Sequence, residues 1–183
     1  MREPVPEHPA EPAPGPSSPS ERGTAVPWRA LAAEALGTAL LLWAIVGSGI
    51  VVAHDGPLVA QLLPHALVVG LALAAFIVML APVSGAHLNP VVTLAAVLLG
   101  HLERRHAAGY VLAQFAGGIA GTVIANATAG LAAVQVSARA RDGAALVGSE
   151  VGATLVLVVL IFLMVRDGRG PGPIGAAVGA YIA

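Results

Sequence analysis

Polar and turn-forming residues are concentrated in one stretch, SGAHLNPVVT, which runs from Ser84 to Thr93 between two apolar segments. Asn89 is a suitable helix N-cap, and Pro90 suits the first helical position. Gly100 can end the helix. The helix expected over 90–99 is too short to cross a membrane, which takes about twenty residues. The stretch therefore predicts a half-helix that begins at membrane depth and follows an extended loop.

Irregular backbone at membrane depth is tolerated only where it is buried in protein or lines a wet cavity. Ser84 to Leu88 would supply backbone carbonyls as acceptors, and the small Gly85 and Ala86 would let that backbone face the lumen. The amide of Asn89 could donate to a neutral solute at the pore centre. An ordinary N-cap explains the capping but not a cap at mid-membrane. The helix end, with about half a positive charge, would repel cations.

The composition indicates an integral membrane protein, with 57% hydrophobic residues, 10% charged residues and a mean hydropathy of +0.84 over 183 residues. The absence of cysteine excludes disulfides, thiol catalysis and thiolate metal sites. A net charge of −1 argues against a nucleic-acid partner. No nucleophile–base pair or metal-ligand cluster is evident, so we expect no enzyme activity, cofactor or metal.

The chain divides into a tail, 1–27, and a membrane domain, 28–183. The tail holds eight prolines and four glutamates, which predicts a disordered, Pro-rich cytoplasmic segment. Beyond it, apolar runs predict an all-α bundle of membrane-spanning helices. The expected spans are Leu31–Val52, Pro64–Pro82, Tyr110–Val136 and Gly148–Val165, with a fifth beginning at Pro173–Ala183.

The arginines indicate the orientation. With the N-terminus in the cytoplasm, the inner segments carry seven arginines and the outer segments carry only Arg139 and Arg141. This arrangement follows the positive-inside rule. We therefore expect a multi-pass protein of the plasma membrane, surrounded by the lipid bilayer, with its half-helix entering from the cytoplasmic side.

The chain contains an internal repeat. Glu34 and Thr38 recur as Glu150 and Thr154 at an offset of 116, and LVVG ending at Gly70 is echoed by AAVG at an offset of 109. An odd number of spans separates the copies, so the second copy is expected to be inverted. Either offset places a second Asn-Pro loop near 198–205. The sequence is therefore expected to be a C-terminally truncated chain that lacks the second half-pore.

The stretch SGAHLNPVVT resembles the first half-pore motif of the aquaporin, or major intrinsic protein, family, written S-G-x-H-x-N-P-A-V-T. Val91 stands where the motif has alanine. The resemblance extends from Trp28 to Ala183. It implies an inverted-repeat helix bundle with a re-entrant half-helix, and a homotetramer when full length. The implied activity is a passive channel for water or small uncharged solutes.

Two intramembrane carboxylates, Glu34 and Glu150, admit two interpretations. They could bind coupling protons or ions, which would make the protein a coupled secondary transporter. Alternatively, each could accept hydrogen bonds from the backbone N–H groups of a re-entrant loop. Their symmetric repetition favours this bracing role, which the family resemblance also implies. A non-conducting fragment of a channel is a third hypothesis. His87 has no partner at metal-ligand spacing, so we expect it to brace the loop.

Val69, twenty residues before Asn89, bears on the choice of solute. The resemblance places it at a constriction where water-selective members carry Phe and glycerol channels carry Trp. Valine there suggests a wider pore. The segments Val46–Ile50 and Ala81–His87 also resemble a bacterial subgroup associated with arsenic-resistance genes. This resemblance suggests glycerol-like or undissociated arsenite-like solutes, while a channel for water or small uncharged solutes in general is the broader expectation.

Two further features are assigned structural roles. Gly117 and Gly121 form a GxxxG pattern, with Gln114 one turn earlier, which predicts close helix packing. His65 and His101, like the other histidines at the ends of spans, are interpreted as surface or interfacial residues.

Overall fold

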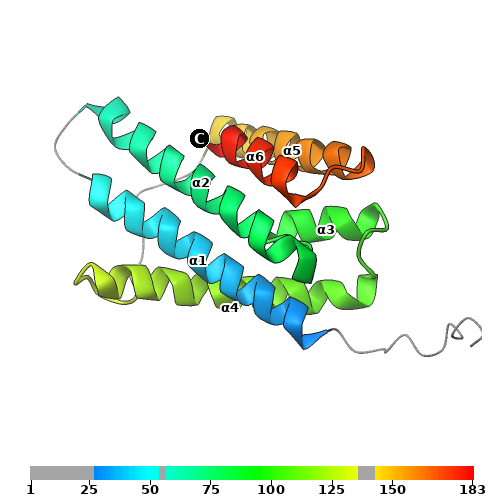
Figure 1. Ribbon diagram of the computed structural model, residues 1–183. Helices are drawn as coiled ribbons and strands as arrows, with labels where there is room; N and C mark the ends of the chain where they lie inside the picture. The colour runs from blue at the N-terminus through cyan, green and yellow to red at the C-terminus, as the bar shows by residue number, and fades with distance from the viewer. Residues whose placement is uncertain (1–26, 54–56, 136–142) are drawn as a thin grey trace, which may run out of the picture.

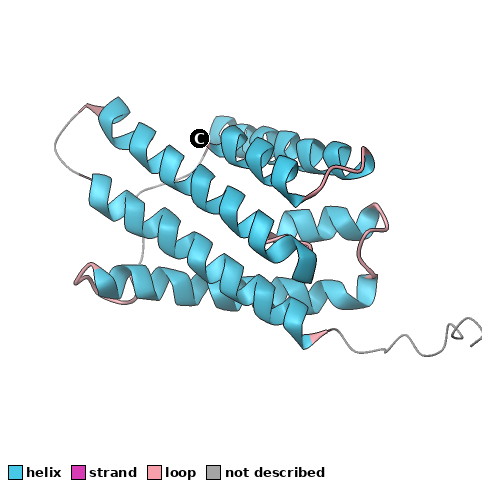
Figure 2. Cartoon of the chain, viewed as in Figure 1, coloured by secondary structure: helices cyan, strands magenta, loops and turns pink. Residues whose placement is uncertain are grey.

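The computed structural model describes residues 27–53, 57–135 and 143–183, which form six α-helices and no strand (Figure 1; Figure 2). Four of these helices are long and apolar enough to cross a membrane, whereas α3 and α6 are shorter. The expected all-α fold with a half-helix is confirmed. Apart from Pro27, the predicted tail lies outside the described residues, as do Arg139 and Arg141. The helices are α1 (Trp28–Val52), α2 (Leu58–Ser84), α3 (Pro90–Leu98), α4 (Arg104–Thr128), α5 (Ala144–Arg166) and α6 (Pro171–Ile182).

Several helix ends differ from the apolar runs. Pro64 and Pro82 lie inside α2 and do not bound it, so the predicted limits of this span were wrong. Proline is tolerated inside transmembrane helices because neighbouring groups can satisfy the freed backbone carbonyl. At its other end, α4 begins at the charged Arg104 and stops at Thr128, well before the predicted end at Val136. Hydropathy alone locates a span by its apolar centre and misses polar first turns.

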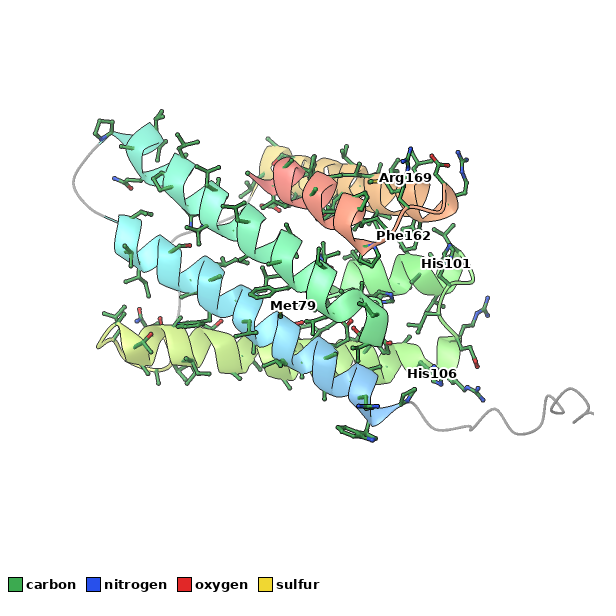
Figure 3. All side chains as sticks on the ribbon, viewed as in Figure 1. Met79, His101, His106, Phe162 and Arg169 are labelled. Atoms are coloured by element: carbon green, nitrogen blue, oxygen red, sulfur yellow. The ribbon has the colours of Figure 1, made fainter. Side chains whose placement is uncertain are left out.

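Helix α1 packs between α2 and α4, and α2 also packs against α6, which contacts α5 (Figure 1). Helix α2 ends, and α4 begins, at the same end of the bundle, so the segment that contains α3 enters and leaves there. Helix α3 contacts α4 and α5. Apolar side chains cover much of the outer surface (Figure 3), and α5 has no buried residue. Such a surface requires lipid or protein against it.

Glycines allow two pairs of helices to approach closely. A Cβ atom added to Gly117 or Gly121 would collide with the carbonyl oxygen of Ala35 or Ala39 on α1. The predicted GxxxG packing between α4 and a neighbour is therefore confirmed. Gly70 of α2 and Gly179 of α6 likewise face each other, because a Cβ on either would collide with the carbonyl oxygen of the other. These are the equivalent glycines of the weaker sequence repeat.

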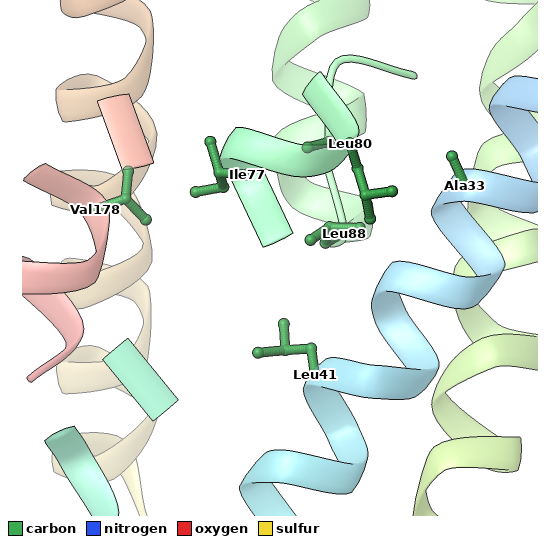
Figure 4. Close-up of a cluster of buried hydrophobic side chains, with 7 residues drawn as sticks. Ala33, Leu41, Ile77, Leu80, Leu88 and Val178 are labelled. Atoms are coloured by element: carbon green, nitrogen blue, oxygen red, sulfur yellow. The ribbon is translucent and has the colours of Figure 1, made fainter. Parts of the chain in front are cut away.

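The apolar core joins the membrane helices to the loop before α3. Leu88, which is 5% exposed, packs in a cluster with buried side chains of α1, α2 and α6 (Figure 4). Gly37 on α1 leaves room for it, since a Cβ there would lie 2.5 Å from atoms of both Leu80 and Leu88. The loop is therefore anchored by an apolar side chain as well as by polar contacts. The labelled members of this cluster are Ala33, Leu41, Ile77, Leu80, Leu88 and Val178.

Candidate functional site

The loop between α2 and α3 has an unusual backbone. Gly85 ends α2 in the left-handed region at φ 87°, and two non-glycine residues, Ala86 and Leu88, follow at φ 48° and 50°. Such residues cost roughly 1–3 kcal/mol each and persist only when their surroundings fix them. Asn89 is extended, and its Oδ1 accepts a hydrogen bond of 2.8 Å from the N–H of Val91. The predicted N-cap, with Pro90 at the first helical position, is therefore present.

The carboxylate of Glu34 on α1 is the main polar support of this loop. Glu34 is fully buried, and each of its oxygens accepts two hydrogen bonds. Oε1 accepts from the Ser84 hydroxyl at 2.7 Å and from the N–H of His87 at 2.9 Å. Oε2 accepts from the N–H of Leu88 at 2.8 Å and from the Gln114 amide at 2.8 Å. All four acceptor positions of the buried carboxylate are thus used.

A second set of contacts surrounds this carboxylate. The Gln114 amide also donates to Thr93 Oγ1 at 2.9 Å, and His87 Nδ1 lies 3.1 Å from the same oxygen. The Tyr110 hydroxyl donates to the carbonyl of Ser84 at 2.9 Å, and its ring lies 5.2 Å from the His87 ring. The expected bracing role of His87 is consistent with these contacts, which tie the loop to α3 and α4.

Three residues of this network were not identified as site residues from the sequence: Thr93, Tyr110 and Gln114. Gln114 was assigned to helix packing, although it is 2% exposed and donates to Glu34. The available signal was its chemistry, because a glutamine on an apolar helix needs polar partners. Tyr110 does not stand out, since its partner Ser84 lies 26 residues away in the chain. Thr93 closes the SGAHLNPVVT stretch, but its contact with Gln114 depends on how α4 packs against the loop.

Two cavities lie on different sides of the loop. Ser84, Gly85, Ala86 and His87 line a cavity of about 520 Å³, whose other walls come from helices α2 to α6 and from the α3–α4 connection. The next residues, Leu88 to Pro90, line a different cavity of about 580 Å³, together with α1 and α4. The predicted pore-lining stretch therefore divides between two cavities, with the loop separating them.

The remaining predicted site residues lie apart from these cavities. Val91 and Glu150 line a third hollow, of about 410 Å³, beside Thr154 on α5. The Glu150 side chain is exposed and makes no hydrogen bond with a described residue. Val69 on α2 is 9% exposed, and it lines none of the three hollows. The structure thus brings Glu34 to the loop but leaves Glu150 without a corresponding partner among the described residues.

Comparison with known proteins identifies relatives that match between 79% and 85% of this chain. The chain is 41% identical over 155 residues to the aquaglyceroporin AqpS of Rhizobium meliloti (strain 1021). The aligned region covers 84% of this chain and 66% of that relative. It is 34% identical over 168 residues to the lens fiber major intrinsic protein of Gallus gallus, an alignment that covers 85% of this chain and 61% of that relative. Identity to aquaporin-2 of Homo sapiens is 33% over 150 residues, which are 79% of this chain and 54% of that relative.

The chain therefore spans between 54% and 66% of the length of these three relatives. The family model of the major intrinsic proteins matches residues 21–183, which is nearly all of the sequence. Together with the four candidate spans, this match makes the chain an integral, multi-pass membrane protein. The resemblance inferred from SGAHLNPVVT is confirmed, and the chain belongs to the major intrinsic protein family.

Proposed function

We propose that this protein is a passive channel for water and small uncharged solutes. The supporting observation is the loop between α2 and α3, which the buried carboxylate of Glu34 holds between two cavities. Irregular backbone is tolerated at membrane depth only where it is buried in protein or lines a wet cavity, and residues of this loop line both cavities. The name aquaglyceroporin, printed for the Rhizobium meliloti relative, supports water and glycerol as substrates.

Asn89 has the chemistry to contact a solute within this channel. Its Oδ1 is occupied by the cap on α3, whereas its amide nitrogen donates to no described residue. Asn89 is half-buried and lines the cavity of about 580 Å³. In our proposal the amide donates to the oxygen of a passing solute, and the loop carbonyls of Ser84 to His87 accept from its hydroxyl groups on the other side.

The main alternative is a coupled secondary transporter in which Glu34 and Glu150 titrate. The contacts of Glu34 argue for bracing, because four donors converge on its two oxygens within 2.9 Å. Protonation would turn one acceptor oxygen into a donor that faces other donors. For Glu150 we propose the same bracing role toward a second re-entrant loop, as the inverted repeat suggests.

The proposal includes the assembly and its location. We propose a homotetramer in the plasma membrane, with the N-terminus in the cytoplasm. The exposed apolar surface of α5 offers area that lipid and neighbouring copies would cover. The two tandem arginines at the start of α4 lie at the end where the half-helix enters, as the positive-inside rule requires for a cytoplasmic end.

Permeability of reconstituted vesicles tests the channel. Purified protein in liposomes should raise water and glycerol flux above that of protein-free vesicles, in a stopped-flow light-scattering measurement without any ion gradient. Ala81→Trp, on the wall of the 520 Å³ cavity, should lower both fluxes. Leu112→Trp, which adds the same ring on the exposed outer face of α4, should leave them unchanged.

Two outcomes would contradict the channel. Flux that needs a proton or sodium gradient and saturates with solute would establish the transporter. Folded, inserted protein that conducts neither water nor glycerol would establish the non-conducting fragment.

A further inference from the structure

We propose that His101 and Phe162 form an aromatic size filter at the open end of the 520 Å³ cavity, distinct from the loop and from Val69. As a filter for neutral solutes this role rests on the proposed channel function. The pair itself is defined by geometry, because both residues line that cavity. Their ring centroids lie 5.5 Å apart with an interplanar angle of 27°, in a stacked arrangement.

The two rings come from different elements and meet at one end of the bundle. His101 lies in the connection between α3 and α4, and Phe162 lies on α5. Figure 3 places both residues, together with Arg169, at the end where α2 finishes and α4 begins. His101 is exposed and Phe162 is half-buried. The pair therefore joins α5 to the α3–α4 connection, and at the exposed His101 the wall of the cavity reaches the surface of the protein.

The backbone of His101 is held in place by the end of α3. Its N–H and that of Leu102 both donate to the carbonyl of Ala96, at 2.8 and 3.1 Å. Gly100 supplies the left-handed residue, at φ 78°, that such a helix ending requires. The ring is thus presented from a fixed backbone, while the side chain itself makes no hydrogen bond with a described residue.

This pair differs from the other aromatic pair in the same cavity. His87 and Tyr110 are tied by hydrogen bonds to Thr93 and to the Ser84 carbonyl, which fixes both rings near the loop. His101 and Phe162 are held to each other only by stacking, which contributes on the order of 0.5–1.5 kcal/mol. Small solutes can pass such a pair, whereas bulky solutes must first displace a ring.

The absence of native cysteine allows a direct measurement of the opening. Ala81→Cys places a single thiol on the half-buried wall of the cavity. In detergent-solubilised protein, its reaction rates with methyl and benzyl methanethiosulfonate would be compared. Phe162→Ala or His101→Ala should raise the benzyl rate at least about fivefold, equivalent to about 1 kcal/mol of barrier, while the methyl rate changes less than about twofold.

Phe115→Ala is the matched control, because Phe115 is 61% exposed and lines the other cavity. It should leave both rates unchanged. If Phe162→Ala fails to fold, as judged by size-exclusion chromatography, Phe162→Leu removes the ring and retains most of the volume. An unchanged benzyl-to-methyl ratio in the folded His101 and Phe162 variants would overturn the proposed filter.

This measurement does not depend on conduction. If the ratio changes but vesicles conduct neither water nor glycerol, the narrow opening is supported, and its role in solute selection fails together with the channel. If vesicles conduct and the ratio is unchanged, the channel is supported and only the aromatic filter is overturned.

Discussion

The carboxylate of Glu34 accepts a hydrogen bond of 2.8 Å from the backbone N–H of Leu88, although the two residues are 54 positions apart in the chain. Leu88 has a positive φ of 50°, and its side chain is buried against α1 and α2. One residue is therefore held by a polar contact to its backbone and by apolar contacts to its side chain. This double attachment explains how a strained loop keeps one conformation between two cavities.

Replacing Glu34 should lower the free energy of unfolding more than replacing a surface carboxylate does. In Glu34→Gln, one oxygen becomes an NH₂ group that faces two donors, so at least two hydrogen bonds are lost in a buried site. We expect a loss of about 3–6 kcal/mol in the free energy of unfolding, because each of the two hydrogen bonds to the charged group contributes about 1.5–3 kcal/mol. The measurement is the denaturant-induced loss of helical circular dichroism in detergent.

Glu103→Gln is the matched control for this substitution. Glu103 pairs with Arg105 at 2.7 Å, but its side chain is 62% exposed, and surface pairs contribute little. Equal stability losses in the two variants would show that Glu34 does not hold the loop.

Local chemistry predicted the cap on α3, because Asn89 and Pro90 act on neighbouring backbone groups. The positions of the spans followed from their apolar length, and Glu34 stood out as a carboxylate in an apolar run. Gln114 and Tyr110 were not recognised, since their roles depend on which helices lie beside the loop. Periodicity and composition describe one element at a time and carry no information about such distant partners.

Adjacent glycines on α4 should respond very differently to alanine. In Gly117→Ala and Gly121→Ala the new methyl group would collide with a carbonyl oxygen of α1, so the helices must separate. We expect losses of about 1–3 kcal/mol, as for other overpacked sites. In Gly118→Ala the methyl group would lie 3.8 Å from side chains of Leu42 and Thr38, an ordinary contact. That variant should be neutral or slightly more stable, given the helix propensity of alanine.

Thermal unfolding of the three glycine variants in one detergent provides the comparison. Similar midpoints for Gly118→Ala and Gly121→Ala would contradict the close approach of α1 and α4.

The repeat glycines show both what the sequence could predict and what it could not. The offset of 109 linked Gly70 to Gly179 and suggested an inverted copy. That the two glycines contact each other is a property of the fold, since it depends on α2 lying against α6. Self-complementary contacts of equivalent residues are expected near a two-fold relationship.

Val69 should affect which solutes permeate, because the family resemblance places it at the outer constriction of the pore. Val69→Phe and Val69→Trp add a ring at a position that is only 9% exposed, so they should reduce glycerol and arsenite flux more than water flux. Stopped-flow measurements on vesicles would follow each solute separately. Val68→Phe, at the neighbouring 45%-exposed position, is the control and should leave the ratio unaltered. A constant solute-to-water ratio in both Val69 variants would place the constriction elsewhere.

The open end of the 520 Å³ cavity carries an unbalanced positive charge. Arg169 lines the cavity, and its guanidinium group makes no ion pair or hydrogen bond with a described residue. Asp167, two residues before Arg169 in the chain, already pairs with Arg166 at 3.4 Å. No acidic residue is found among the described residues that line this cavity. Cations should therefore be disfavoured at this opening.

Arg169→Gln should weaken that preference. With the single thiol of Ala81→Cys, the negatively charged sulfonatoethyl methanethiosulfonate should react faster than the positively charged trimethylammonium-ethyl reagent, after correction for their intrinsic rates. Removing the arginine should lower this rate ratio roughly two- to fivefold at low salt. The effect of the substitution should become small toward 1 M salt, because the Debye screening length shortens as salt is added. Arg104→Gln, on an exposed arginine outside the cavity lining, should change the ratio less. Equal effects of the two substitutions would mean that general surface charge, and not Arg169 at the opening, sets the preference.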